Sequence, residues 1–278
     1  MIVAIASGKG GTGKTTLATS MALAVGELQF LDCDVEEPNA YHFLKPVLKG
    51  TNSVRAFIPV LNPNLCSQCR KCVQFCQYNA LALVKGRVII FPELCHSCGG
   101  CKILCPTGAI REGEREIGTI QIGTAMEGIE FIDGALNIGN PSSVPIIRKM
   151  KGLIDEDRRV IIDSSPGTSC AMVESVSEVD YCILVTEPTP FGLNDLRIAV
   201  ETLKMLQVPF GVVINRDGIG DERVEEYCKE EKIEVLLKIP DSREIAEAYS
   251  KGIPFVEVLP EWRGKLQALY EHIEGAVE

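Results

Sequence analysis

Eight of the twelve cysteines in this chain of 278 residues fall in two short runs, and their spacing constrains the fold more than any other feature. The first run, "CSQCRKCVQFC", starts at Cys66 and follows the pattern C-x2-C-x2-C-x3-C. The second, "CHSCGGCKILC", repeats this spacing from Cys95, and Pro106 follows it. An internal repeat of this kind predicts two related half-modules. Between the runs, "ALALVKGRVIIF" alternates around Lys85-Gly86 and predicts a β-hairpin.

The rest of the composition limits what these thiols can do. The opening residues, "MIVAIAS", predict a strand rather than an export leader, and no apolar run approaches the ~20 residues that span a bilayer. We therefore expect a cytoplasmic protein, in which many cysteines indicate metal or redox chemistry rather than disulfides. The net charge of −10 argues against binding to nucleic acid or to an anionic membrane surface. Zinc is the less favoured metal, because structural zinc sites use paired C-x2-C knuckles separated by a longer loop.

A phosphate-binding loop stands at the start of the chain. The segment "GKGGTGKT", from Gly8 to Thr15, fits G-x-x-x-x-G-K-[ST] at every position, between an apolar strand and a helical segment. Its backbone N–H groups and the helix N-terminus favour phosphate, Lys14 would meet the β- and γ-phosphates, and Thr15 would bind Mg²⁺. The expected nucleotide-binding residues of this loop are Gly10, Gly11, Thr12, Gly13, Lys14, Thr15 and Thr16.

Lys9, the first lysine in "KGGTGKTT", adds a resemblance to a known family. This segment resembles the deviant phosphate loop of the MinD/ParA/nitrogenase-iron-protein superfamily of P-loop ATPases. The resemblance implies that Lys9 reaches across a nucleotide-sandwich dimer to the phosphates of the partner. It therefore implies ATP or ADP with Mg²⁺ as ligands, and a dimer of identical chains or of two paralogues.

Other segments fall where that superfamily places functional residues. The resemblance implies that Asp34, in "FLDCDVEEPN", orients the attacking water, with Asp32 two residues earlier near the strand end. In "RVIIDSSPGTSC", Asp163 would hold a Mg²⁺-bound water and the Gly167 N–H would sense the γ-phosphate. Two further expected base contacts are Asn215 in "GVVINRDG" and Asp241 in "IPDSREI". The implied catalytic set is Lys9, Lys14, Asp34 and Asp163.

Alternating strands and helices predict the fold class. Apolar strand candidates occur at 2–6, 28–32, 129–133, 159–163, 181–186, 209–214 and 234–239. We expect an α/β fold with a mostly parallel P-loop NTPase sheet covered by helices on both faces. The alternation stops between 59 and 112, which predicts a discontinuous ATPase domain, 1–58 and 113–278, around a small α+β insertion at 59–112. The last segment, "PEWRGKLQALYEHIEGAVE", predicts an amphipathic helix packed on the ATPase domain.

The insertion resembles a bacterial ferredoxin with two [4Fe–4S] clusters. In such proteins three cysteines of one run and the fourth of the other hold each cluster. The resemblance therefore assigns Cys66, Cys69, Cys72 and Cys105 to one cluster, and Cys95, Cys98, Cys101 and Cys76 to the other. Gln77 departs from the pattern, which has proline there, and we expect His96 to be a solvated loop histidine.

Four cysteines lie outside the runs. Cys33, Cys182 and Cys228 fall in strand or helix patterns and are expected to be small buried hydrophobic side chains. Cys170 follows Asp163 by seven residues, where the nitrogenase iron protein has a cluster ligand. A buried thiol is the favoured interpretation of Cys170, and a metal or cluster contact is the alternative.

Three functions remain open from the sequence. Relatives within the superfamily include the nitrogenase iron protein, which couples ATP to electron transfer, and the Mrp/Nbp35-type carriers, which assemble Fe–S clusters. We expect an ATPase that couples a nucleotide-driven dimer switch to low-potential electron transfer to a partner protein. An ATP-dependent cluster assembly or carrier protein ranks nearly equal, and a redox-sensing regulatory ATPase is the third hypothesis.

Overall fold

The computed structural model describes residues 1–277. Its main body is one large sheet with the strand order β11-β10-β9-β1-β8-β2-β7-β6-β3. Neighbouring strands from β11 to β7 are parallel. The parallel strands are β1 (Ile2–Ala6), β2 (Leu28–Asp32), β7 (Glu130–Leu136), β8 (Arg159–Asp163), β9 (Tyr181–Thr186), β10 (Phe210–Asp217) and β11 (Val235–Pro240). The predicted α/β class and all seven predicted strands are thus confirmed.

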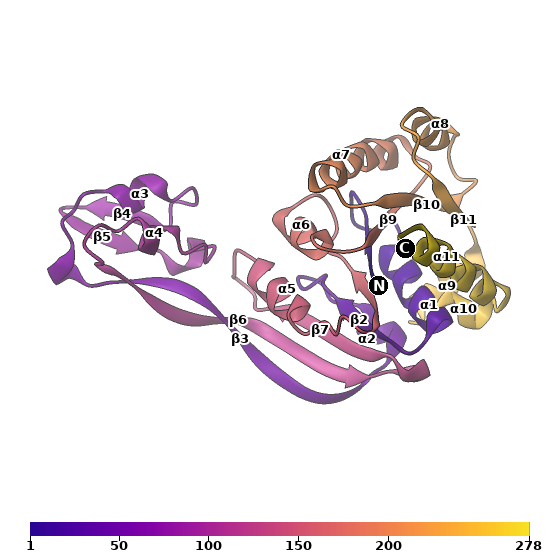
Figure 1. Cartoon of the computed structure of the whole chain (residues 1–278), viewed down its shortest axis with the longest axis horizontal. Helices are drawn as coiled ribbons and strands as arrows, with labels where there is room; N and C mark the ends of the chain where they lie inside the picture. Colours follow the sequence, from indigo (N-terminus) through magenta and orange to yellow (C-terminus); the bar gives the residue numbers. More distant parts are fainter. Residues whose placement is uncertain (278) are drawn as a thin grey trace.

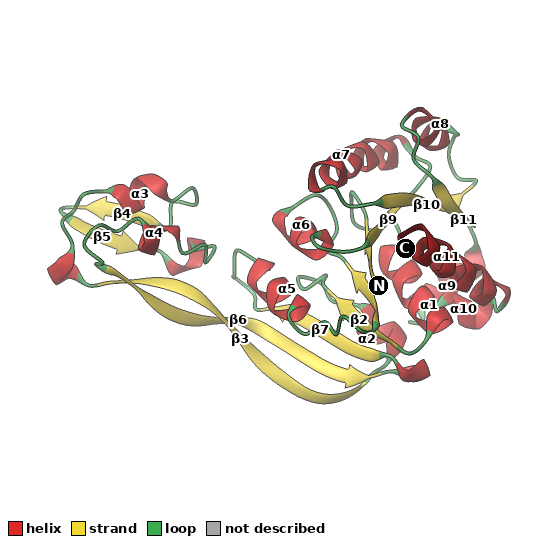
Figure 2. Ribbon diagram, in the orientation of Figure 1, coloured by secondary structure: helices red, strands yellow, loops and turns green. Residues whose placement is uncertain are grey.

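Helices cover both faces of this sheet, as Figure 2 shows. Continuous apolar runs such as "IVAIA" suit strands that are buried on both sides. The helices on one face are α5 (Val144–Lys151), α6 (Cys170–Val176), α7 (Pro190–Leu206) and α8 (Arg223–Glu230). The helices on the other face are α1 (Lys14–Val25), α2 (Ala40–Leu44), α9 (Arg243–Ser250), α10 (Phe255–Val258) and α11 (Glu261–Val277).

The C-terminal segment forms the predicted amphipathic helix. In α11, Trp262, Leu266 and Ile273 are buried in the core that α1 shares. The expectation that this segment packs on the domain is therefore confirmed. Within residues 1–277, no helix is both long enough and apolar enough to cross a bilayer.

Two strands that the sequence analysis did not predict extend the sheet at one edge. They are β3 (Val47–Leu61) and β6 (Ile110–Thr124), which pair with each other in antiparallel fashion. β6 also pairs with β7, but only from Gly118 to Thr124, so residues 110–116 pair with β3 alone and project as a two-stranded ribbon. Glycines and charged residues in "IREGEREIGTIQIGT" hide the apolar alternation typical of a strand. Both strands run across the boundaries expected at 58/59 and 112/113.

The ribbon carries a small lobe with its own core, at the left of Figure 1. Its hairpin confirms the prediction from "ALALVKGRVIIF": β4 and β5 pair around Lys85 and Gly86, whose φ values are 48° and 76°. The elements of the lobe are the 3₁₀ turns η1 (Pro63–Leu65) and η2 (Pro92–Leu94), the helices α3 (Lys71–Phe75) and α4 (Gly100–Ile103), and the strands β4 (Leu81–Val84) and β5 (Arg87–Ile90). A third turn, η3 (Met126–Gly128), joins β6 to β7.

Candidate functional site

The phosphate-binding loop lies between the central strand β1 and the N-terminus of α1. Gly13 caps α1 with a φ of 93°, and a Cβ at this position would overlap the Asn215 amide, so the site requires glycine. The Asn215 Nδ2 donates to the Thr12 carbonyl oxygen at 2.7 Å, which ties the loop to β10. The Thr12 hydroxyl is buried and has no hydrogen-bond partner within the described residues. The loop is therefore shaped and held by its neighbours, with N–H groups of the α1 terminus at its edge.

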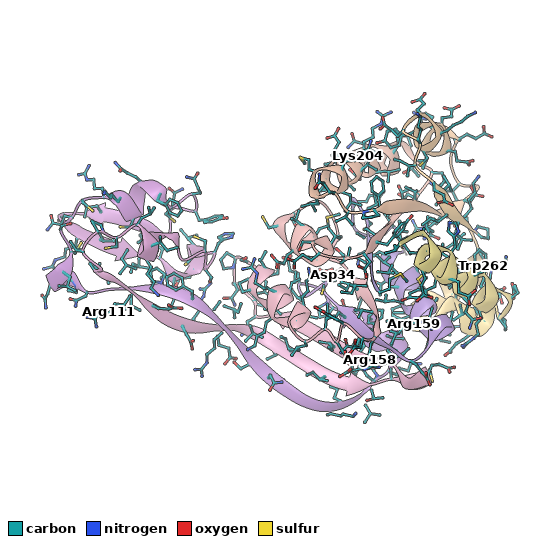
Figure 3. The ribbon with its side chains drawn as sticks, in the orientation of Figure 1. Asp34, Arg111, Arg158, Arg159, Lys204 and Trp262 are labelled. Atoms are coloured by element: carbon teal, nitrogen blue, oxygen red, sulfur yellow. The ribbon has the colours of Figure 1, made fainter. Side chains whose placement is uncertain are left out.

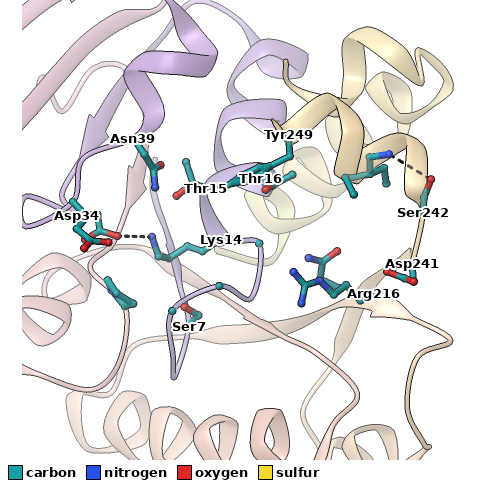
Figure 4. Close-up of a pocket in the computed structure, with 18 of the residues that line it drawn as sticks. Ser7, Lys14, Thr15, Thr16, Asp34, Asn39, Arg216, Asp241, Ser242 and Tyr249 are labelled. Carbon is teal, nitrogen blue, oxygen red and sulfur yellow. Dashed lines mark hydrogen bonds and ion pairs between the residues drawn. The ribbon is translucent and has the colours of Figure 1, made fainter. Parts of the chain in front are cut away.

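Lys14 is buried between two carboxylates. Its Nζ donates to Asp163 Oδ1 at 2.7 Å and lies 3.6 Å from Asp34 Oδ2, an arrangement visible in part in Figure 4. Burial by itself lowers the pKa of Lys14, but the charges of Asp163 and Asp34 outweigh it and raise the pKa. Burial also raises the pKa of Asp34, to about 6, although Lys14 opposes that change. An incoming phosphate would have to replace the carboxylates around Lys14.

Three aspartates stand side by side on adjacent strands, two of them at the carboxyl end of their strand. Asp32 of β2 is in register with Asp163 of β8 and with Asp133 of β7. The Asp32 carboxylate accepts hydrogen bonds from the N–H groups of Asp34, Asn39 and Ala40, and so fixes the loop that carries Asp34. Burial, with Asp163 and Asp133 nearby, raises the pKa of Asp32 to about 8. Asp32 thus acts as a structural anchor for the loop after β2.

The loop and the strand ends surround a cavity of about 400 Å³, shown in Figure 4. Lys14, Thr15, Thr16 and Asp34 line one end. Asn215 and Asp241 line the other end, together with Tyr249 from α9. The full lining is Ser7, Gly10, Gly11, Gly13, Lys14, Thr15, Thr16, Asp34, Glu37, Asn39, Pro166, Asn215, Arg216, Pro240, Asp241, Ser242, Ile245, Ala246 and Tyr249. An end with the Lys14 ammonium group and two threonine hydroxyls, and a second, partly apolar end, suit a nucleotide, with its phosphates at the first end and its base at the second.

Two expected phosphate contacts are engaged within the chain. The Lys9 Nζ forms an ion pair with Glu187, whose other carboxylate oxygen accepts from Arg216 at 3.1 Å. The Gly167 N–H donates to the Ser7 carbonyl oxygen at 2.9 Å. Both groups would have to leave these partners to reach a phosphate.

The eight cysteines of the lobe gather around two cavities, each lined by four of them. The first cavity, about 20 Å³, is lined by Cys66, Cys69, Cys72 and Cys105, and we call it the first hollow. The second hollow, about 230 Å³, is lined by Cys76, Cys95, Cys98 and Cys101. Each hollow therefore takes three cysteines from one run and one from the other, the same grouping that the ferredoxin resemblance implies.

The backbone around the two runs repeats as the sequence does. Positive φ values occur at Gln68 and Arg70 in the first run and at the corresponding Ser97 and Gly99 in the second. The Ala80 N–H donates to Cys76 Sγ at 3.4 Å, and the corresponding Ala109 N–H donates to Cys105 Sγ at 3.2 Å. The lobe is thus built from two similar halves that exchange their fourth cysteine.

The thiol groups favour a cation between them. Burial, together with the neighbouring thiols Cys95 and Cys98, raises the pKa of Cys101 to about 11. A bound metal relieves this cost, because it stabilises the thiolate form. Within residues 1–277 no three His, Cys, Asp or Glu side chains converge closely enough to hold a single metal ion. Four thiols spread around a hollow instead suit a cluster, in which each thiolate binds a different iron.

One expectation about an individual residue is wrong, and another holds only in part. His96 lies in a loop, as expected, but it is only partly exposed, because its ring stacks on Tyr78 with centroids 3.6 Å apart and lines the second hollow. Cys170 is exposed, because it lies at the first position of α6, where the loop after β8 reaches the surface. Cys33, Cys182 and Cys228 are buried as predicted.

Comparison with known proteins identifies the family of the nucleotide-binding body. The sequence profile of the CobQ/CobB/MinD/ParA nucleotide binding domain matches residues 3–255. The chain belongs to this family. It is also 33% identical over 269 residues to the uncharacterized protein MJ0579 of Methanocaldococcus jannaschii, with 92% of each chain covered.

Two further matches have lower identity. An iron-sulfur cluster carrier protein of Pyrococcus horikoshii is 22% identical over 275 residues, which is 91% of this chain and 78% of that protein. Among solved structures, the cell division ATPase MinD of Pyrococcus furiosus superposes with a TM-score of 0.57 at 20% identity, with 98% of each chain covered. At this identity the MinD likeness shows the fold alone.

Three residues of this CobQ/CobB/MinD/ParA chain escaped the sequence analysis. Asp133 follows an apolar run in "FIDG", just as Asp32 and Asp163 follow theirs, and that pattern could have revealed it. Glu187 follows β9, but no local pattern shows that it holds Lys9. Tyr249 lies on an ordinary amphipathic helix and reaches the nucleotide cavity only through the tertiary fold.

Proposed function

We propose that this protein binds and hydrolyses Mg·ATP and couples that nucleotide switch to two [4Fe–4S] clusters that carry low-potential electrons to a partner protein. One observation carries the proposal: the two cysteine runs sort into two groups of four, in the same chain as a phosphate-binding loop. When bound, the clusters would supply one-electron chemistry, at roughly −400 mV for ferredoxin-type centres.

The residues of the nucleotide cavity have defined tasks in this proposal. Lys14 would leave Asp163 and Asp34 to bind phosphate, and Thr15 would bind Mg²⁺. Asp163 would then hold a Mg²⁺-bound water through an oxygen that has no partner within the described residues. Asp34 would orient the attacking water, and the Gly167 N–H would exchange the Ser7 carbonyl for the γ-phosphate. Lys9 would leave Glu187 to reach the partner subunit, which is an identical chain or a paralogue.

A continuous segment connects this switch to the lobe. The loop that carries Asp34 leads into α2 (Ala40–Leu44), and β3 follows after only Lys45 and Pro46. On its other side, α2 contacts a residue that lines the nucleotide cavity, since Phe43 packs on Tyr249 with ring centroids 5.2 Å apart. A displacement of this loop on nucleotide binding would therefore reach the ribbon that carries residues 59–112, the proposed cluster domain.

A carrier or assembly function is the second candidate. It is favoured by the similarity to a protein named as an iron-sulfur cluster carrier over 91% of this chain. It is also favoured by the exposure of Cys170 beside the loop after β8, where a thiol can reach an external metal. A purely redox-sensing regulatory ATPase has no separate observation in its favour.

The test is anaerobic EPR of the dithionite-reduced protein with iron counted on the same sample, with and without Mg·ATP. We expect about eight irons per chain and two coupled signals whose shape or reduction rate changes with ATP. An Asp34→Asn variant should keep the ATP response while losing hydrolysis, and a Lys14→Ala variant should lose both. EPR signals that do not change with ATP would reject the proposed coupling. An iron content well above eight per chain would favour the carrier function.

A further inference from the structure

Charge is divided unevenly between the lobe and the rest of the chain. Residues 59–112 contain six cations and two carboxylates, a net charge of +4, although the whole chain carries −10. The remaining residues therefore carry −14. The lobe is a basic body attached to an acidic one.

Four of the six cations surround the first hollow. Arg70 and Lys71 line it directly. Lys85 and Arg87 flank the turn of the β4–β5 hairpin, and a Cβ on Gly86 in that turn would lie 3.3 Å from Gln68 Oε1, so the turn borders the same loop. We call Arg70, Lys71, Lys85 and Arg87 the basic rim.

The charges of the basic rim face solvent. All four side chains are exposed, and within residues 1–277 none of them forms an ion pair. Lys102, elsewhere on the lobe, does pair with Glu112. The second hollow, by contrast, is bordered by Phe75, Tyr78 and His96 and by no Lys or Arg. The basic surface is thus specific to one end of the lobe.

The ribbon separates this surface from the acidic body. Residues 110–116 of β6 pair only with β3, and at about 3.3 Å per residue this stretch spans roughly 20 Å. The screening length at physiological ionic strength is about 8 Å. In Figure 3, Arg111 marks the lobe end of the ribbon, far from Asp34 in the body. An acidic molecule approaching the lobe would therefore meet the basic rim without repulsion from the body.

We propose that the basic rim is a docking surface for an acidic protein. Opposite charges steer such a protein to the end of the lobe where the first hollow opens. The docking itself is independent of the proposed function, and only the purpose of the contact, access to the first cluster, rests on that function. Compensation of the negative charge of thiolates is a different role for the same cations, and it requires no partner.

The test measures binding of two acidic probes to the full-length protein by fluorescence anisotropy: a labelled poly-glutamate peptide of about 20 residues, and flavodoxin. We expect both to bind at low salt, with affinity falling at least tenfold between about 50 and 300 mM NaCl. The variants Arg70→Gln/Lys71→Gln and Lys85→Gln/Arg87→Gln should each weaken binding about tenfold. The matched control Lys229→Gln/Lys232→Gln, on the exposed surface near α8, should change it less than twofold.

Several results would overturn the proposal. The proposal fails if neither acidic probe binds, or if the rim variants bind the probes as tightly as the unaltered protein does. It also fails if a short RNA or phosphatidylglycerol vesicles bind more tightly than the acidic probes. Salt-sensitive self-association with no probe binding would likewise contradict it. Rim variants that change only the reduction potential of the protein would assign the cations to charge compensation.

Because Arg70 adjoins Cys69, iron content is measured for every variant, and Lys85→Gln/Arg87→Gln decides the outcome if the other pair loses iron. Loss of ATP-dependent EPR changes with intact docking would reject the proposed function alone.

Discussion

At the scale of single residues, the nucleotide site depends on carboxylates that are held close together. Asp163, Asp32 and Asp133 lie in register on three neighbouring strands, and Lys14 pairs only with the first of these. Asp133 has an oxygen with no hydrogen-bond partner within the described residues, and burial raises its pKa to about 7. A carboxylate in this position costs stability whenever it is ionised.

The first prediction concerns the pH dependence of that cost. The folded-state pKa of Asp133, about 7, lies above the ordinary value of 3.8, so stability is lost as pH rises from about 4 to 7. Asp133→Asn should therefore stabilise the protein at pH 8 by roughly 1–3 kcal/mol, and clearly less at pH 5. Urea unfolding at both pH values measures this. Glu271→Gln, an exposed control, should change stability by less than about 0.5 kcal/mol, and an equal gain at both pH values would contradict the prediction.

At the scale of elements, the lobe is two copies of one unit: a 3₁₀ turn, a loop with two positive φ values and a short helix. Each copy gives three cysteines to one hollow and its fourth to the other. The fourth cysteine lies past the end of its short helix, so the chain carries it across to the other half. The exchange makes each hollow depend on both halves.

Paired cysteine substitutions test this exchange. Cys66→Ser/Cys105→Ser removes two side chains from one hollow, and about four irons should remain per chain. Cys66→Ser/Cys76→Ser, in which both changes fall in one run, damages both hollows and should leave almost no iron. Iron analysis and EPR after reconstitution measure this. If each run held its own cluster, Cys66→Ser/Cys105→Ser would leave almost no iron and Cys66→Ser/Cys76→Ser would leave about four irons.

At the scale of the whole molecule, the ribbon is the only covalent link between the lobe and the body. β3 and β6 stay paired up to Leu61 and Ile110, and the Asn62 N–H donates to the Ala109 carbonyl oxygen just beyond. The lobe also has its own core, which is centred on Ala80, Leu81 and Val88. Two bodies with separate cores and one narrow connection can be separated by design.

Excision of the lobe is the corresponding prediction. Replacing residues 62–109 with Asn-Gly should close β3 and β6 as a two-residue hairpin. We expect a folded, iron-free protein whose affinity for Mg·ATP stays within about threefold of the full chain. Circular dichroism and titration with a fluorescent ATP analogue measure this. A protein that fails to fold would show that the body needs the lobe for stability.

Local pattern alone determined much of this protein. The apolar runs predicted the seven parallel strands, because strands buried on both faces need continuous apolar sequence. Glycine and lysine spacing predicted the phosphate-binding loop, and the resemblance of the cysteine runs to a bacterial ferredoxin implied which thiols share a hollow. In each case the signal lies within a short segment.

Only the tertiary structure decided the rest, because it brought together residues that no local pattern connects. The pairing of Lys9 with Glu187, the row formed by Asp133 with Asp32 and Asp163, and the stacking of His96 on Tyr78 each join segments from different elements. The ribbon was missed because its strands carry charged residues and glycines, and they gain stability from pairing with each other more than from a buried face. The length of the ribbon places the basic rim away from the acidic body. Amino-acid composition gives the charges of the two parts but not the distance between them.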